Sequence, residues 1–125
     1  MPVMHERSGQ ETMLVERVKQ ISAPLPETTI EVDGFGHTAF RVGGRSFVLV
    51  GAGGGRGSLS IKTDPATQEQ LVEEGPYIRT PGLGHHGWIT VWGDDPLDWV
   101  EVTELIREAW QRVAPKRLTR RAAGY

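Results

Sequence analysis

Residues 39–50 read AFRVGGRSFVLV, and this stretch predicts a β-hairpin. Both arms, Ala39–Val42 and Ser46–Val50, carry valine and phenylalanine, which favour strands. Between the arms, Gly43 and Gly44 tolerate the positive φ angles that a tight hairpin turn requires. The segment therefore predicts two antiparallel strands joined by a short turn.

Strand signals continue on both sides of this hairpin. In residues 28–33, β-branched side chains alternate with other residues, which predicts a strand. Residues 59–63 follow a glycine-rich loop at 51–57, so a second hairpin is predicted between 46–50 and 59–63. Residues 88–92 form another apolar, aromatic run that predicts a strand. Residues 77–87, rich in proline and glycine, are expected to form a loop.

Helical patterns separate these strands. Residues 11–22 have apolar side chains at helical spacing, with Thr12 as a candidate N-cap. A second helix is expected to start at Asp64-Pro65 and to end at Gly75-Pro76. A third, over 99–113, begins after Asp98 and has one apolar face. Helices mixed with hairpins predict an α+β domain with an antiparallel sheet.

The chain has 125 residues, which is enough for one domain. We expect a flexible arm at 1–10, the folded domain at 11–115 and a basic C-terminal tail at 116–125. No apolar run reaches the length of a membrane span and no signal segment is apparent, so no membrane association is expected. The absence of cysteine fits a cytoplasmic location.

Charge is unevenly distributed, although the net charge is only −2. Acidic residues dominate 64–108, and the residues after 111 carry basic side chains without an acid. This balance of acidic and basic residues excludes a uniformly basic, histone-like protein. A local basic patch could still orient a polyanion, although a solvated acidic face with a basic tail explains the same pattern.

The glycine cluster at 51–57 does not match a phosphate-binding loop. Neither the Gly-x-Gly-x-x-Gly spacing nor a following Gly-Lys-Ser/Thr is present, and a strand rather than a helix is expected next. The loop is interpreted as a flexible hairpin tip that displays Arg56, as the Gly43-Gly44 turn displays Arg45. Two hairpins that each present an arginine could straddle phosphates, or could simply carry soluble turn residues.

The histidines and tryptophans offer few catalytic signals. His85 and His86 are adjacent rather than at ligand spacing, so neither a metal site nor a cofactor is expected. His37 could be oriented by nearby Asp33, although packing or a backbone hydrogen bond explains it equally simply. Trp88 and Trp92 share one face of a strand and are expected in the core, with base stacking as the alternative.

Three segments resemble the MmcQ/YjbR-like family. Gly36–Arg45 is similar to that family's G-H-P-A-F-R-V-G-G-K segment, Pro81–Val91 to its G-x-x-G-W-V-x-V strand entry, and Leu105–Ala114 to its closing helix. The order is that of the family over residues 11–118. The resemblance implies a compact α+β fold with two hairpin wings, called double-wing and similar to the CyaY fold.

The resemblance also implies a function, because members of this family are commonly described as DNA-binding. The expected activity is weak, salt-sensitive contact with DNA phosphates. It would be made by basic residues on and near the wings, namely Arg41, Arg45, Arg56, Lys62 and Arg79.

The alternative is a non-catalytic domain that binds a small molecule or a protein in a pocket near His37, His86 and Trp88. An enzyme ranks third, because no nucleophile motif or metal site stands out. A monomer or a small homo-oligomer is expected.

Overall fold

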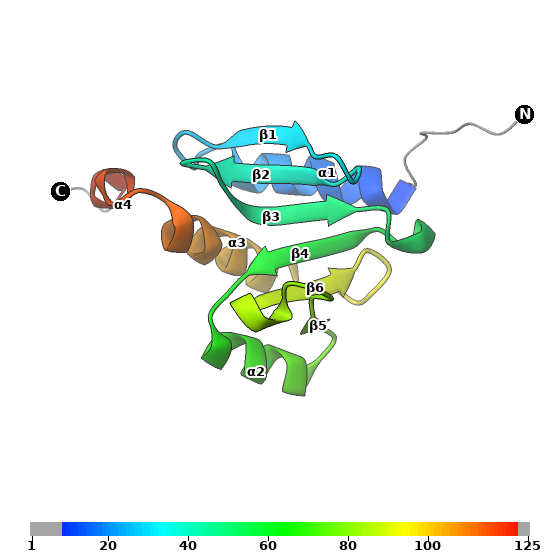
Figure 1. The fold of residues 1–125 in the computed structure, drawn as a ribbon. Coiled ribbons are helices and arrows are strands. Elements are labelled where there is room, and N and C mark those ends of the chain that lie inside the picture. The colour runs from blue at the N-terminus through cyan, green and yellow to red at the C-terminus, as the bar shows by residue number, and fades with distance from the viewer. Residues whose placement is uncertain (1–8, 123–125) are drawn as a thin grey trace, which may run out of the picture.

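The computed structural model describes residues 9–122, with side chains through residue 120, and shows a six-stranded sheet covered by helices on one face (Figure 1). Helices α1 (Gly9–Ser22) and α3 (Trp99–Val113) cover that face, while α2 (Pro65–Glu74) lies beside one edge and α4 (Lys116–Ala122) follows α3. The predicted α+β class is confirmed. None of the described helices is both long and apolar enough to cross a bilayer.

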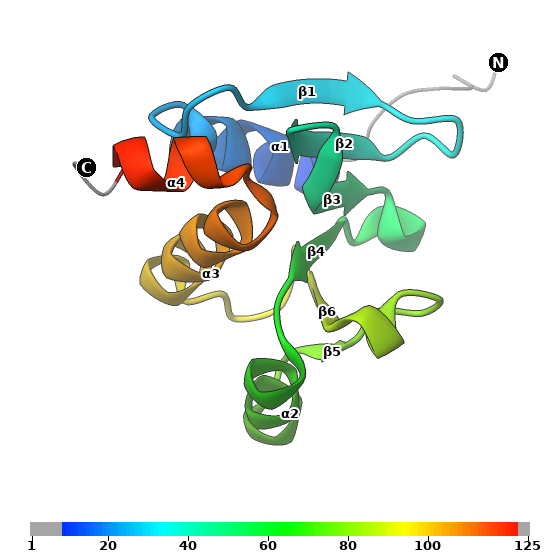
Figure 2. The ribbon, with the colours of Figure 1, turned by 60° about the vertical axis from the view of Figure 1, so that its left-hand side comes forward.

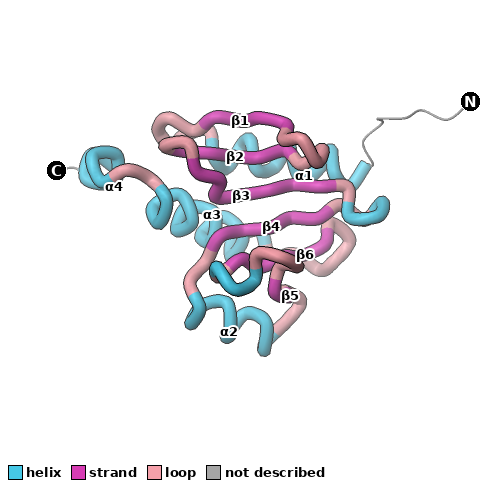
Figure 3. Tube along the Cα trace, viewed as in Figure 1, coloured by secondary structure: helices cyan, strands magenta, loops and turns pink. Residues whose placement is uncertain are grey.

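All neighbouring strands run antiparallel, in the order β1-β2-β3-β4-β6-β5 (Figure 3). The first four form a meander, and α2 with β5 lies between β4 and β6 in the sequence. The strand bounds are β1 (Thr29–Val32), β2 (Thr38–Val42), β3 (Arg45–Gly51), β4 (Ser58–Lys62), β5 (Ile78–Arg79) and β6 (Trp88–Trp92).

Both predicted hairpins are confirmed. Val42 pairs with Arg45, so Gly43 and Gly44 alone make the turn between β2 and β3. Their φ angles are +59° and +77°, which a side chain with a Cβ would adopt only at a cost in strain. The second hairpin joins β3 to β4 through a short 3-10 turn at Gly53–Gly55.

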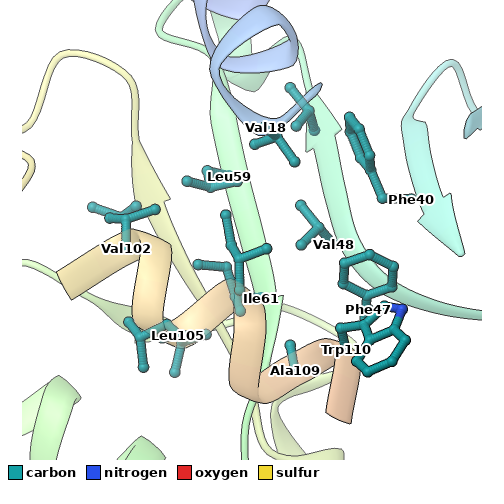
Figure 4. Packing of buried hydrophobic residues seen from close by; sticks show 14 of the residues in the cluster. Val18, Phe40, Phe47, Val48, Leu59, Ile61, Val102, Leu105, Ala109 and Trp110 are labelled. Carbon is teal, nitrogen blue, oxygen red and sulfur yellow. The ribbon is translucent and has the colours of Figure 1, made fainter. Parts of the chain in front are cut away.

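The core lies between the sheet and helices α1 and α3 (Figure 4). Trp110 is almost fully buried beside Phe47, and its Nε1 donates a hydrogen bond to the Pro26 carbonyl at 3.2 Å. Burial of such large side chains contributes roughly 1.5–3 kcal/mol each. Other core members are Leu14, Val18, Phe40, Val48, Leu59, Ile61, Ile89, Val102, Leu105, Ile106 and Ala109.

The first helix begins earlier than its sequence pattern predicted. Because α1 starts at Gly9, Thr12 lies inside the helix, and its assignment as the N-cap is wrong. Gly9 and Gln10, placed in the expected arm, are helical. Residues 1–8 of that arm lie outside the described residues.

The segment 77–87 is not wholly a loop, as we had expected. It contains β5, in which Ile78 pairs with Thr90, and a 3-10 turn called η2 at Gly84–His86. A two-residue strand has no periodicity to detect, so only the pairing with β6 reveals it.

The expected basic tail contains a helix. Within α4, Leu118 is fully buried against the core. Arg117 forms two hydrogen bonds with the Glu27 carboxylate, at 2.9 and 3.0 Å. Residues 123–125 of the tail lie outside the described residues.

Strand β6 presents its tryptophans to the face opposite the expected one. Ile89 and Val91 belong to the core cluster, whereas Trp88 and Trp92 line cavities on the other side of the sheet. Trp88 is nevertheless buried, as expected, with 7 % of its surface exposed. Figure 1 looks onto this face, with α1 and α3 behind the sheet, and Figure 2 shows the sheet from its side, with α3 on one side of it and the loop that precedes β6 on the other. We call the face that carries the tryptophans the outer face.

Candidate functional site

Strand pairing arranges the outer face as successive rows of side chains. Lys62 pairs with Trp88 in one row. In the next row Ser60 lies between Leu49 on β3 and Thr90 on β6. Since side chains on one face recur every second residue, the rows are spaced by roughly 7 Å along each strand. The basic and the hydroxyl-bearing side chains therefore occupy adjacent rows.

A cavity of about 380 Å³ opens on this face, and three of the side chains lining it are cationic. Arg41 comes from β2, Arg45 from the start of β3 and Lys62 from the end of β4. We call this cavity the basic pocket. Its other lining residues are Asp33, Ser46, Leu49, Leu83, His86, Trp88 and Val113.

The guanidinium of Arg41 is incompletely paired. Its Nε is buried and has no hydrogen-bond partner in the described part of the chain. Such a buried, unsatisfied donor costs roughly 1–3 kcal/mol. Asp33, the carboxylate among the lining residues, contacts His37 instead. An anion that entered the pocket would lie against this positively charged guanidinium.

Lys62 is held close to other cations. Its Nζ donates to the His86 carbonyl. Burial lowers the pKa of Lys62 below 10.5, and the charges of Arg112 and Arg45 lower it further against an opposing effect of Asp64. Because an anion would favour the charged ammonium, binding at this point would raise that pKa.

Arg112 connects the end of α3 to this region. Its Nη2 lies 2.9 Å from Asp64 Oδ2, and its Nη1 donates to the Lys62 carbonyl at 3.5 Å. Asp64 also caps α2 by accepting from the Thr67 backbone N–H. That hydrogen bond is the main cause of the lowered pKa of Asp64.

The loop that carries His86 is fixed to the sheet and to α2. Gln68 is 2 % exposed, and its Nε2 donates to the carbonyls of Gly84 at 2.6 Å and Trp88 at 2.9 Å. Gly87 has a φ of +87°, and a Cβ there would lie 2.3 Å from the Thr63 carbonyl oxygen. Only glycine fits this close approach. The wall of the basic pocket is therefore preformed.

A second cavity, of about 300 Å³, lies beside the first one. It contains a hydroxyl chain: Thr90 Oγ1 lies 2.8 Å from both Ser60 Oγ and Thr80 Oγ1. We call it the hydroxyl pocket. Its other lining residues are His37, Leu49, Gly53, Ser58, Pro81, Leu83 and Trp92.

Asp33 orients His37, as the sequence suggested. Its Oδ2 lies 3.3 Å from His37 Nδ1, and its Oδ1 accepts from the backbone N–H groups of Phe35 and His37. Burial alone would raise the pKa of Asp33, but these hydrogen bonds and the imidazole outweigh it, so the pKa is lowered. The imidazole is thereby held at the rim of the hydroxyl pocket.

Arg56 does not join the other basic residues. Its Nε donates to Asp94 Oδ1 at 2.9 Å, its Nη2 lies 3.5 Å from Asp95, and its guanidinium covers the Trp92 ring at 4.9 Å. Arg45 and Arg56 flank opposite ends of β3, because successive turns of a meander alternate between the ends of a sheet. These two arginines therefore do not belong to one pocket, and contact of the two hairpins with separate phosphates stays a prediction.

Arg79 is also engaged elsewhere. Its Nη1 donates to Gln68 Oε1, and it lines neither the basic pocket nor the hydroxyl pocket. Of the predicted DNA contacts, the structure brings together Arg41, Arg45 and Lys62. Of the predicted small-molecule pocket, His86 and Trp88 join these three cations, while His37 lines the neighbouring cavity.

The acidic residues after β6 have structural contacts. Asp98 accepts from the backbone N–H groups of Val100 and Glu101, as its assignment as the N-cap of α3 predicted. Asp95 accepts from the Trp92 N–H. Across residues 9–122, no three metal-ligating side chains are grouped closely enough to hold an ion.

Sequence reasoning missed the hydroxyl chain and the contribution of Arg112. The alternation Ser58, Ser60, Lys62 was a signal that β4 has one polar face. Thr90 lies between the two tryptophans on the same face of β6, but its pairing with Ser60 depends on the non-sequential contact of β4 with β6.

Comparisons with known proteins agree with this architecture. The structure is similar to that of the Deinococcus radiodurans protein DR2400, which has a domain of family DUF419. The TM-score is 0.73 at 22% sequence identity, over 97% of this chain and 91% of that chain. No curated protein matches the sequence. The sequence profile named YjbR matches residues 23–112. The chain therefore belongs to the YjbR family.

Proposed function

We propose that this protein binds the phosphate group of a small ligand in the basic pocket, without a catalytic step. The observation that supports the proposal is the convergence of Arg41, Arg45 and Lys62 on one cavity. Arginine presents several N–H donors in a planar fork, and lysine adds a compact charge, so the set suits a phosphate.

The shape of the site favours a small ligand. Pockets for small molecules typically enclose roughly 300–1,000 Å³, and the basic pocket measures about 380 Å³. Trp88 and Leu83 supply apolar wall beside the cations. Such a concave site fits one terminal phosphate better than it fits a continuous duplex backbone.

DNA is the second candidate, supported by a neighbouring basic surface. A Cβ on Gly43 would lie 2.9 Å from the Pro115 ring, so the β2–β3 turn lies against the start of α4. The exposed Arg45 and Lys116 therefore flank the same contact. In this alternative, the hairpin acts as a wing and the phosphates contact the surface rather than enter the pocket.

Calorimetric titration with inorganic phosphate and with a short DNA duplex separates the two candidates. For phosphate binding, Arg41→Gln should weaken affinity about tenfold or more, because a charged hydrogen bond contributes roughly 1.5–3 kcal/mol. Arg56→Gln is the matched control and should leave affinity unchanged, since Arg56 is paired with Asp94 and Asp95.

The outcomes are distinct. Loss of DNA binding in Lys116→Gln, with no measurable phosphate binding in the native chain, would favour the DNA alternative. Binding of neither probe, even at low salt, would rule out both candidates.

A further inference from the structure

We infer that the basic pocket and the hydroxyl pocket form one binding site for a sugar phosphate, with the phosphate among the cations and the sugar over the hydroxyl chain. This inference rests on the proposed function, which concerns the phosphate alone. It adds the chemical class of the group attached to that phosphate.

The two cavities share a wall. Leu49 on β3 and Leu83 in the loop over the sheet line both cavities. Ser60 precedes Lys62 by two residues on the same face of β4, which corresponds to roughly 7 Å. A ligand that carries hydroxyl groups a few bonds away from its phosphate would therefore reach both sets of polar atoms.

The hydroxyl chain has a hydrogen to donate. Ser60, Thr80 and Thr90 carry three hydroxyl protons, and the two hydrogen bonds that join them use two of these. Ser60 and Thr90 are 7 % and 3 % exposed, whereas Thr80 is half-buried, so Thr80 is the end of the chain that is open to the pocket. One O–H in the chain is consequently left for a ligand, as is lone-pair capacity on the oxygens. A sugar hydroxyl, both donor and acceptor, complements this arrangement.

The hydroxyl pocket selects for an uncharged group. Its lining contains no aspartate, glutamate, lysine or arginine. His37 and Trp92 stand at its other side, and Leu49 with Leu83 offers apolar surface to the C–H groups of a sugar ring. The charge is thus confined to the phosphate end. This asymmetry matches a sugar phosphate rather than a bisphosphate or a polyanion.

The test compares four probes by calorimetry: inorganic phosphate, ribose, ribose 5-phosphate and adenosine 5′-monophosphate. We expect ribose 5-phosphate to bind about tenfold more tightly than phosphate, and ribose alone to bind too weakly to measure. Tighter binding of the nucleotide than of ribose 5-phosphate would identify the source of the sugar phosphate as a nucleotide, and equal binding would identify a free sugar phosphate.

A hydroxyl-deleting variant locates the sugar. Thr90→Val should reduce affinity for ribose 5-phosphate about tenfold and leave affinity for phosphate unchanged. Thr103→Val is the matched control, because its hydroxyl donates to the Trp99 carbonyl within α3. Ser60→Ala provides a second deletion in the chain if Thr90→Val fails to fold by circular dichroism.

Two results would overturn the inference. If ribose 5-phosphate bound no more tightly than phosphate, or if the hydroxyl deletions weakened both equally, the sugar site would be wrong while phosphate binding stood. If no phosphate compound bound, the proposed function would fail together with the inference.

Discussion

At the scale of single residues, the charge of Lys62 depends on what occupies the basic pocket. Burial and two neighbouring guanidinium groups lower its pKa below 10.5. Arginines keep their charge at all accessible pH values, so Lys62 is the cation among the three that can lose its charge on the alkaline side. Anion binding and the protonation of Lys62 are therefore linked.

This linkage can be tested with sulfate, because the charge of sulfate is constant from neutral to alkaline pH. Sulfate favours the protonated lysine, so its affinity should be full at neutral pH and should fall as pH rises through the lowered pKa of Lys62. Lys62→Arg should retain sulfate binding and lose this alkaline decline. Calorimetric titrations with sulfate at several pH values measure the affinity of the native chain and of Lys62→Arg. An unchanged decline in Lys62→Arg would show that another group is responsible.

Residue types made part of the site predictable. Arg41, Arg45 and Lys62 were recognisable as cations on or beside hairpins, and Asp33 lies near enough to His37 in the sequence to orient it. The ion pairs of Arg56 could not be predicted from the sequence, because Asp94 and Asp95 lie 38 and 39 positions further along the chain. Only the tertiary fold decides which of several exposed arginines is neutralised.

At the scale of elements, α2 depends on its cap. Asp64 accepts from the Thr67 N–H at 2.8 Å and from the Thr67 hydroxyl at 3.0 Å. These hydrogen bonds favour the carboxylate, so the folded-state pKa of Asp64 lies below 3.8. The stabilisation is therefore full above the unfolded value and is lost as pH falls through the folded one.

Asp64→Ala should lower the free energy of unfolding by about 1 kcal/mol at neutral pH. The difference from the native chain should shrink in acid, below the ordinary aspartate pKa of 3.8. Urea denaturation at several pH values checks this, with Asp98→Ala as a parallel loss of cap at α3. A difference that stays constant into strong acid would contradict the role of the ionised carboxylate.

Helix α4 docks mainly through one apolar side chain. Leu118 is fully buried, whereas Arg117 forms an exposed ion pair with Glu27. Leu118→Ala should therefore destabilise the fold by about 2–5 kcal/mol, and Arg117→Ala by much less, because solvent screens its exposed ion pair. Urea denaturation of both variants measures the two losses in the free energy of unfolding. Equal losses would show that the ion pair, not the buried leucine, holds the helix.

The elements with strong local signals were predictable, and the others were not. Helix α3 has a capping Asp98 and a continuous apolar face, and its bounds agree with the prediction. In β6 both faces carry large apolar side chains, so alternation alone could not decide whether Ile89 and Val91 or the two tryptophans face the helices. A seven-residue helix with one buried leucine, α4, likewise gives little pattern to detect.

At the scale of the whole molecule, the sheet separates two kinds of surface. Helices α1 and α3 cover one face, while the outer face is left to the loop over residues 80–87 and to the two cavities (Figure 2). The basic pocket draws on β2, β3, β4, β6 and η2, which no local sequence window contains. The α+β class was predictable, whereas the meeting of these residues required the strand order.

Phosphate binding in the basic pocket can be followed through the Nε–H resonance of Arg41, one of the three cations that line it. A nitrogen-15 correlation spectrum, recorded during titration with inorganic phosphate, follows this group and the Arg56 Nε–H together. We expect the Arg41 signal to shift and saturate, because the phosphate charge comes to lie against its guanidinium. The Arg56 signal, already paired with Asp94, should stay in place. An Arg41 signal that does not move, or equal unsaturated shifts of the Arg41 and Arg56 signals, would show that phosphate does not bind in the basic pocket.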